Sequence, residues 1–497
     1  MPISQTDQLF TLIKSLSKAE KRNFTVYANR IQDSDTLKYV QLFELMDKQK
    51  DLNEPQILQK LKDTDKSQYS NLKRHLYKQI MISLRMIYIQ KKADIEIREY
   101  LDFVDILYSK GLYIQSLKLL EKAKGLALKS NNDILFLSLL ETEKTIESRH
   151  ITRTGPDNTS HITNLALKTS EEILNSTKLS NLRLLLHAFY IKNGHVKNQE
   201  EYDNIHQFFE ENLPKLDIKK LNFPEQVFLY QSLVWYYYIL LDFENCFVYA
   251  EKWIKAFKQH PEMIEEDPDL FMRGYHYLLT CCFTLGEEKK YLSSLDELEK
   301  FRKNNYKKFS TNSQIISFLY VHHGRLNKYF LLKKYKEGLV EIPKTLRRLA
   351  RYKTKLDPHR IMVFYFKIAW MYLMSKDASK AIDYLNEIQK MEVGALREDI
   401  QIYTRIMFMM AHYDMGNYEI MEYLANNTKI IATKLHDTNK LQHQTIAFFS
   451  KLVRIPVADR RGEFKKFQQD LQVLKYDNYE KRAFVYLDLE QWILTKI

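Results

Sequence analysis

Few side chains in this sequence have the type and spacing that catalysis or metal binding requires. The 14 histidines are scattered, and His322-His323 is the only adjacent pair. Neighbouring residues of a helix do not share a face, so this pair is not expected to chelate one ion. The acidic pair Glu265-Glu266 falls in a segment that we predict to be a loop, where a solvated charge is expected instead of a general acid or base. We therefore predict no metal site at either pair.

Sequence signatures of nucleotide binding and hydrolysis are absent as well. The sequence has no Gly-rich phosphate loop ending in Lys-Ser or Lys-Thr, no Gly-x-Gly-x-x-Gly, no His-Glu-x-x-His, no nucleophile elbow and no kinase motif set. The three cysteines Cys246, Cys281 and Cys282 lack the spacing of a metal site or a disulfide framework, and indicate core residues in a reducing compartment. We therefore expect a protein that is not an enzyme and that needs no cofactor and no metal.

The composition favours an ordered, helical protein. The chain has 497 residues, of which 45% are hydrophobic and 28% charged, a balance typical of globular proteins. Only 11 Gly and 10 Pro are present, whereas sheet proteins and nucleotide-binding folds need Gly for tight turns and close phosphate approach. The net charge is +13, with basic residues spread along the whole sequence. This excess fits either a lysine-rich solvated surface or an acidic or nucleic-acid partner.

Hydropathy predicts a cytoplasmic protein with no membrane insertion. The N-terminal residues have neither the charged start nor the apolar run of a signal peptide. The longest apolar stretch, residues 227–241, contains Gln231 and Ser232 and is too short to cross a bilayer.

A helical hairpin is repeated five times between residues 227 and 434. Each copy has a short polar turn, followed by apolar positions five, nine and twelve residues later that share one helix face. Successive turns lie 40 to 47 residues apart, and no strand-like alternation separates them. This recurrence is typical of stacked helix pairs. The first residues of the five turns, called the turn residues below, are Leu241, Gly286, Lys333, Lys376 and Gly416.

In these hairpins the sequence resembles the tetratricopeptide-repeat (TPR) family. In that family a turn Gly is followed by an aromatic residue at two, a small residue at five and another at twelve positions. Gly416, Tyr418, Met421 and Thr428 keep this spacing, and so do Gly111, Tyr113, Ser116 and Ala123. The preceding helices agree, with tyrosines four residues before the turn (Tyr237, Tyr329, Tyr372) and eleven before it (Tyr230, Tyr275, Tyr365). The sequence departs from the family in its longer period and in lacking the closing Pro. The resemblance spans about residue 95 to the C-terminus and implies an all-α, right-handed α-solenoid of TPR-like hairpins.

The resemblance also implies a concave groove lined by the first helices of the hairpins. In the family, ligand-facing residues lie thirteen, ten, six and three positions before the turn. Large aromatic rings at these positions suit an apolar or aromatic peptide segment or helix, although any of them could instead belong to the core between helices. Carried onto this sequence, the partner-binding residues are Phe228, Gln231, Trp235, Tyr238, Arg273, His276, Phe283, Tyr320, His323, Asn327, Phe330, Phe366, Trp370, Tyr403, Met410 and Tyr413.

The first 94 residues lack the repeat and predict a separate helical domain. Ser17 and Glu20 have the spacing of a capping box, and Pro55 fits the first turn of a short helix. The pair of predicted helices 55–61 and 67–80 loosely resembles a helix-turn-helix, whose second helix would present Asn71, Lys73, Arg74 and Lys78 to nucleic acid. The alternative is a solvated face on a capping helix.

The chain is thus predicted to contain four parts. These are a helical N-terminal domain (1–94), degenerate TPR-like hairpins (95–222), clearer hairpins (223–455) and C-terminal capping helices (456–497). Within them we expect two helices at about 158–176 and 180–196, and a proline-bearing loop at 260–268.

The predicted repeat architecture favours a function in binding a partner molecule. The prediction is a non-enzymatic protein-interaction scaffold or adaptor that holds a protein or peptide partner in the concave groove. An alternative is a regulator whose basic N-terminal domain contacts DNA, RNA or an effector protein, similar only in layout to bacterial peptide-responsive regulators. Nucleic-acid binding would require Lys and Arg clustered on one face.

Overall fold

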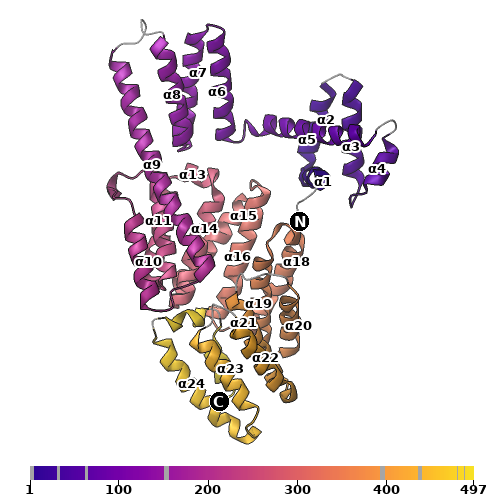
Figure 1. The fold of residues 1–497 in the computed structure, drawn as a ribbon, viewed down its shortest axis with the longest axis vertical. Coiled ribbons are helices and arrows are strands. Elements are labelled where there is room, and N and C mark those ends of the chain that lie inside the picture. The colour runs from indigo at the N-terminus through magenta and orange to yellow at the C-terminus, as the bar shows by residue number, and fades with distance from the viewer. Residues whose placement is uncertain are drawn as a thin grey trace. The chain divides into compact units, whose positions relative to one another are not determined.

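The computed structural model describes the chain except residues 1–4, 31–33, 62–64, 150–155, 392–397, 435–438, 478 and 486. The described residues form α-helices and short 3-10 helices and contain no strand, which confirms the all-α class (Figure 1). None of the helices in these residues has the length and hydropathy of a membrane span. The chain divides into two compact units, residues 1–171 and 172–497.

The first unit begins with five helices around one apolar core. They are α1 (Gln5–Ser15), α2 (Lys18–Arg30), α3 (Ser34–Lys48), α4 (Glu54–Lys60) and α5 (Lys66–Tyr88). The predicted capping box is confirmed, since the Ser17 amide donates to the Glu20 carboxylate (2.7 Å) and the Glu20 amide to Ser17 Oγ (3.3 Å). Leu9, Phe24 and Ile80 are fully buried in the core that joins α1, α2 and α5.

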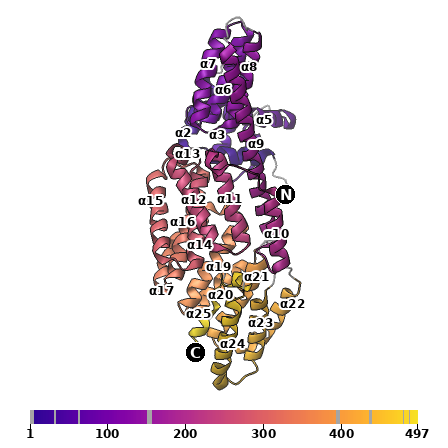
Figure 2. The ribbon, with the colours of Figure 1, turned by 90° about the vertical axis from the view of Figure 1, so that its left-hand side faces the viewer.

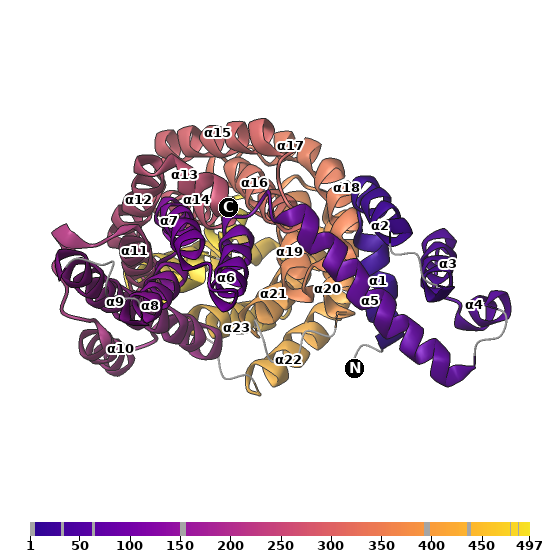
Figure 3. The same ribbon diagram turned by 90° about the horizontal axis from the view of Figure 1, so that it is seen from above.

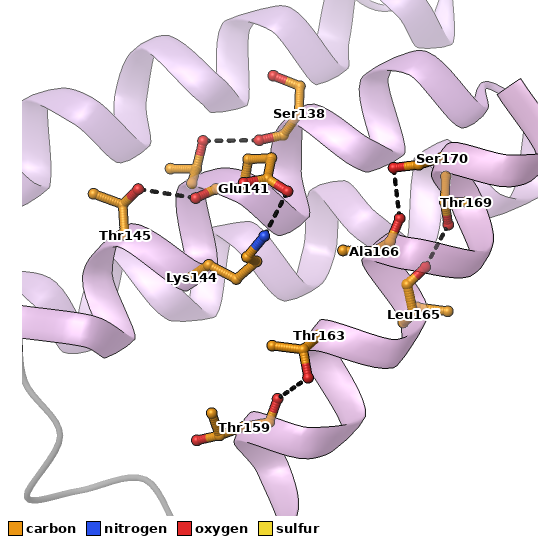
Figure 4. A network of polar contacts seen from close by, with 11 residues as sticks. Ser138, Glu141, Lys144, Thr145, Thr159, Thr163, Leu165, Ala166, Thr169 and Ser170 are labelled. Atoms are coloured by element: carbon orange, nitrogen blue, oxygen red, sulfur yellow. Dashed lines mark hydrogen bonds and ion pairs between the residues drawn. The ribbon is translucent and has the colours of Figure 1, made fainter. Parts of the chain in front are cut away.

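The rest of the first unit consists of α6 (Ala93–Ser109), α7 (Tyr113–Lys129), α8 (Asp133–Arg149) and the start of α9 (Pro156–Asn193). The prediction of two helices at 158–176 and 180–196 is wrong, because α9 is continuous over 38 residues. No Gly or Pro interrupts it before residue 194. Hydroxyl groups also bond within its own turns, as Figure 4 shows for Thr163 to the Thr159 carbonyl (2.9 Å) and Ser170 to that of Ala166 (2.8 Å).

Residues 172–497 form a row of antiparallel helices in which most successive long helices pack against each other (Figure 2). The expected loop at 260–268 contains a short helix instead, because Pro261 is suited to a first helical turn. After the end of α9, the α-helices are α10 (Gln199–Asn212), α11 (Phe223–Ile239), α12 (Phe243–Gln259), α13 (Pro261–Glu266), α14 (Pro268–Leu285), α15 (Glu288–Asn305), α16 (Thr311–Leu331), α17 (Tyr335–Gly338), α18 (Ile342–Tyr352), α19 (Pro358–Met374), α20 (Ala378–Gln389), α21 (Glu398–Asp414), α22 (Met421–Ala432), α23 (Lys440–Leu452), α24 (Arg460–Lys475) and α25 (Leu489–Leu494).

All five turn residues have the same backbone conformation, which confirms their prediction. Their φ angles lie between 55° and 77°, in the left-handed region. At each turn, the amide of the turn residue donates to the carbonyl three residues earlier, and the next amide donates to the carbonyl five residues before it. This pair of bonds is the Schellman motif, which ends a helix and satisfies its last carbonyls. Gly111 and Asn131 in the first unit make the same two bonds.

The helix that follows each turn also has the predicted register. All fifteen residues at five, nine and twelve positions after the turn residues are buried, from Cys246, Ala250 and Trp253 to Met421, Ala425 and Thr428. Two hairpins reproduce even their aromatic contacts. Tyr237 stacks on Tyr249 (centroids 5.6 Å apart) and Tyr372 stacks on Tyr384 (5.7 Å), at equivalent positions of the two hairpins.

The turn at Lys376 gives a direct test of this geometry. Lys376 is exposed and has a φ of 67°, a conformation that disfavours every residue with a Cβ. Lys376→Gly should therefore raise the free energy of unfolding by about 1 kcal/mol. The exposed Lys255→Gly in the middle of α12 should lower it by about 1 kcal/mol. Urea denaturation measures both, and two changes of the same sign would contradict the assigned turn.

Candidate binding cavity

A cavity of about 600 Å³ lies among the first helices of the hairpins in residues 172–497. Its walls come mainly from the last part of α9, from α11, α14, α16, α19 and α21, and from the C-terminal segment, and Tyr291 of α15 and Tyr335 of α17 add one residue each. Figure 3 shows α14, α16 and α19 on the inner side of an arc whose outer side is formed by α12, α15, α17 and α18. The second helices of the hairpins thus cover the outside, and the first helices present their free face to the cavity.

More than half of the residues predicted to bind a partner line this cavity. They come from four hairpins, and Thr280 and Val363 lie at equivalent positions beside them. The predicted residues in the lining are Tyr238, His276, Phe283, Tyr320, His323, Asn327, Phe330, Phe366 and Trp370.

Four predicted residues of the first two hairpins do not line the cavity. Trp235 lies within an aromatic cluster, with its ring 4.8 Å from that of His187 and 5.5 Å from that of Tyr277. Gln231 is buried in α11. Phe228 lies under the guanidinium of Arg183, 5.8 Å from its ring centroid, and Arg273 is partly buried on α14.

The three predicted residues of the fifth hairpin are covered by the C-terminal helices. Tyr403 and Met410 are fully buried on α21, and the Tyr403 hydroxyl accepts a hydrogen bond from the Asn439 amide (3.0 Å). The Tyr413 ring packs against the rings of Phe464 (5.5 Å) and Trp492 (5.9 Å). The last part of the chain therefore occupies the side of α21 that the repeat pattern assigns to a ligand.

Two histidines form flat, uncharged parts of the cavity wall. His276 stacks on Tyr320 with ring centroids 4.5 Å apart, and His323 stacks on Phe364 at 4.1 Å. Burial, helped by the charge of Lys367, lowers the pKa of His276 to about 3 and holds that of His323 well below its usual value. Both rings are therefore neutral at pH 7 and can act as donor or acceptor to a ligand.

Apart from Asp488 of the C-terminal segment, the charged groups of the lining come from α19 and from the residue before it. Arg360 pairs with Asp357 (2.9 Å), and the Lys367 amine donates a hydrogen bond to the side-chain carbonyl of Asn327. Lys367 and Asn327 belong to successive hairpins, so this bond fixes both side chains at the cavity wall. The sequence pattern did not single out Arg360 or Lys367, because the family positions on α19 select Phe366 and Trp370.

The C-terminal segment contributes to the wall of the cavity. Phe484 and Asp488 belong to its lining, and burial raises the pKa of Asp488. The Tyr479 hydroxyl donates to the side-chain oxygen of Gln199 on α10 (2.8 Å), although the two residues are 280 positions apart. Trp492 Nε1 donates to the Asp414 carboxylate (3.1 Å). The mixture of aromatic and charged residues in this segment indicated a capping helix, but not its position at the cavity.

The four residues considered for nucleic-acid binding lie on α5 in the first unit. Asn71, Arg74 and Lys78 are exposed. Lys73 is instead largely covered, with its amine 3.0 Å from the Glu54 carboxylate and 4.5 Å from the centroid of the Tyr69 ring. Lys73 therefore holds α4 against α5.

Within the described residues, no group of three or more His, Cys, Asp or Glu side chains could hold a metal ion. His322 and His323 point to opposite sides of α16, since only His323 lines the cavity. Comparison of the chain with protein-family models, with curated proteins and with solved structures finds no match. The relation to the TPR family therefore stays a prediction.

Proposed function

We propose that the hairpins form a right-handed α-solenoid of TPR-like repeats. The recurring Schellman turn, the buried register after it and the packing of each helix on its neighbours support this proposal. Such an array holds ligands on the side lined by first helices.

The proposed function is to bind a peptide segment of a partner protein in the central cavity, as a non-enzymatic cytoplasmic scaffold. The cavity lining carries this proposal. Aromatic rings from four successive hairpins converge on it with a few hydrogen-bonding groups between them, a composition typical of ligand sites. Rigid rings bury much apolar area at a low cost in entropy.

The polar groups of the wall favour an extended peptide over a helix. A helix already satisfies its own backbone N–H and C=O groups through bonds four residues apart. A short extended segment instead exposes its backbone groups to the polar residues of the wall.

The polar groups indicate which peptide would be recognised. Lys367, Arg360 and Asn327 offer donors to backbone carbonyls or a carboxylate, and Phe283, Phe330 and Trp370 surround an apolar side chain. We therefore expect a peptide with one aromatic or large aliphatic residue next to an acidic group or a C-terminal carboxylate.

The test is selection of peptides from a random library on the purified full-length protein, followed by calorimetric measurement of Kd. The double variant Thr280→Trp with Val363→Trp should fill the cavity with ring atoms that take the place of the peptide. The Kd of the selected peptides should therefore rise by more than about tenfold. The matched control is Val340→Trp, since Val340 is 58% exposed and lies outside the cavity. Equal affinity in the filled and control variants would overturn the proposal.

A further inference from the structure

A second, strongly basic pocket of about 410 Å³ lies between α15, α16 and α18. It shares no residue with the central cavity. All seven side chains that line it are cationic or can become so: Arg302, His322, Arg325, Lys344, Arg347, Arg348 and Arg351. In the sequence these residues are separated by up to 49 positions, and the packing of the three helices brings them together.

Positive charge in this pocket exceeds the negative charge around it. Glu299 accepts from Arg325 Nε (2.7 Å), and Glu341 lies 3.5 Å from both Arg325 and Lys344. Two carboxylates thus face six Lys and Arg side chains. The arginines repel each other, and burial together with the charge of Arg348 lowers the pKa of Arg302.

The arginines are nevertheless held in place by two tyrosines. The guanidinium of Arg302 lies 5.4 Å and that of Arg348 5.8 Å from the centroid of the Tyr306 ring. Arg348 also donates to the Tyr306 hydroxyl (3.2 Å), which lies 3.1 Å from that of Tyr352. Arg302 Nε is buried and has no hydrogen-bond partner. A buried guanidinium N–H with no acceptor, beside further cations, is an arrangement that a bound anion would complete.

We propose that this pocket binds a compact small molecule bearing phosphate groups. Guanidinium groups match phosphate oxygens with two parallel hydrogen bonds, and several arginines together suit a diphosphate or triphosphate. The cations converge from three helices on one concavity, whereas a nucleic-acid strand needs a track of cations along its backbone. The volume accommodates a polyphosphate chain with a small attached group.

Calorimetric titration of the full-length protein at 150 mM KCl tests this proposal with four probes: inorganic phosphate, inorganic pyrophosphate, ATP and adenosine. Pyrophosphate and ATP should bind, phosphate should bind at least tenfold more weakly, and adenosine should not bind. Arg302→Gln with Arg348→Gln should weaken pyrophosphate at least tenfold. Arg461→Gln with Lys465→Gln removes the same charge from exposed positions on α24 and should change Kd less than twofold.

A rim variant separates loss of binding from loss of folding. Arg347 and Arg351 are exposed, so Arg347→Gln with Arg351→Gln leaves the packing intact and should weaken pyrophosphate about three- to tenfold. No heat with pyrophosphate and ATP, or the same Kd in wild-type, rim and α24 variants, would overturn the proposal. A single-stranded RNA that displaces pyrophosphate and binds more tightly would also overturn it, in favour of a nucleic-acid site.

Discussion

Replacing Trp492 with Ala should lower the free energy of unfolding of residues 172–497 by about 4 kcal/mol. Trp492 is 1% exposed, and its ring contacts those of Tyr413, Phe449 and Phe464 at 5.7–5.9 Å. Truncation leaves a cavity in the core between α21, α23 and α24. It also removes the hydrogen bond to the Asp414 carboxylate, which lies at the surface and also pairs with Lys496.

Urea denaturation followed by tryptophan fluorescence measures this change in the second unit. All four tryptophans of the chain (Trp235, Trp253, Trp370 and Trp492) belong to that unit, so their emission does not report the unfolding of residues 1–171. The control is Tyr476→Ala, because Tyr476 is 85% exposed and its truncation should change stability by less than about 0.5 kcal/mol. Similar losses in both variants would show that the C-terminal helices are not packed as described.

The same variant connects the C-terminal segment to the cavity. Phe484 and Asp488 line it, and they precede Trp492 in one short segment. If Trp492→Ala loosens this segment, peptides selected on the wild-type protein should bind more weakly. Unchanged peptide affinity together with reduced stability would mean that the cavity does not need its C-terminal wall.

The repeat could be predicted because its determinants are local. A residue with positive φ and a buried face at fixed offsets leave a pattern within about 25 residues of sequence, as at Gly416 and Gly286. The continuity of α9 was missed because the polar residues between positions 176 and 180 resemble a linker. Their hydroxyl groups are compatible with a helix when no Gly or Pro intervenes.

The cavity could be predicted only in part because it depends on long-range packing. Family positions located Tyr238, His276 and Phe330 correctly on its wall, since each hairpin orients its own first helix. They placed Tyr403 and Met410 in the groove as well, where Phe449, Leu487 and Trp492 complete the core. No local sequence pattern predicts that the C-terminal segment packs back against the hairpins that precede it. The arginine pocket has the same origin, since the spacing of Arg302, Arg325 and Arg348 has meaning only once α15, α16 and α18 are packed.

Stability of the second unit should fall steeply between pH 7 and pH 5. Burial lowers the pKa of His276 and that of His322 to about 3. The nearby charges of Lys367 and Arg273 add to the shift of His276, and those of Arg302 and Arg325 add to the shift of His322. The pKa of His323 is lowered in the same direction. Below the ordinary pKa of about 6.5, the unfolded chain binds protons at these three rings that the folded chain does not. Their contribution to stability is therefore complete above pH 6.5 and is lost as the pH falls.

The expected size follows from proton linkage. His276 and His322 each contribute a loss of about 1.4 kcal/mol per pH unit below 6.5, hence about 2 kcal/mol each at pH 5 and about 4 kcal/mol together, and His323 acts in the same direction. His322→Gln removes one titrating ring and can keep a hydrogen bond to Thr345, whose hydroxyl lies 2.9 Å from His322 Nδ1. Between pH 7 and pH 5 the free energy of unfolding of this variant should fall by about 2 kcal/mol less than that of the wild-type protein. His443→Gln, at an exposed position of α23, should behave as wild type. Tryptophan-detected urea midpoints at pH 7, 6 and 5 give the comparison. A wild-type midpoint that stays constant over this range would mean that the three rings accept protons in the folded protein, and hence that burial does not keep them neutral.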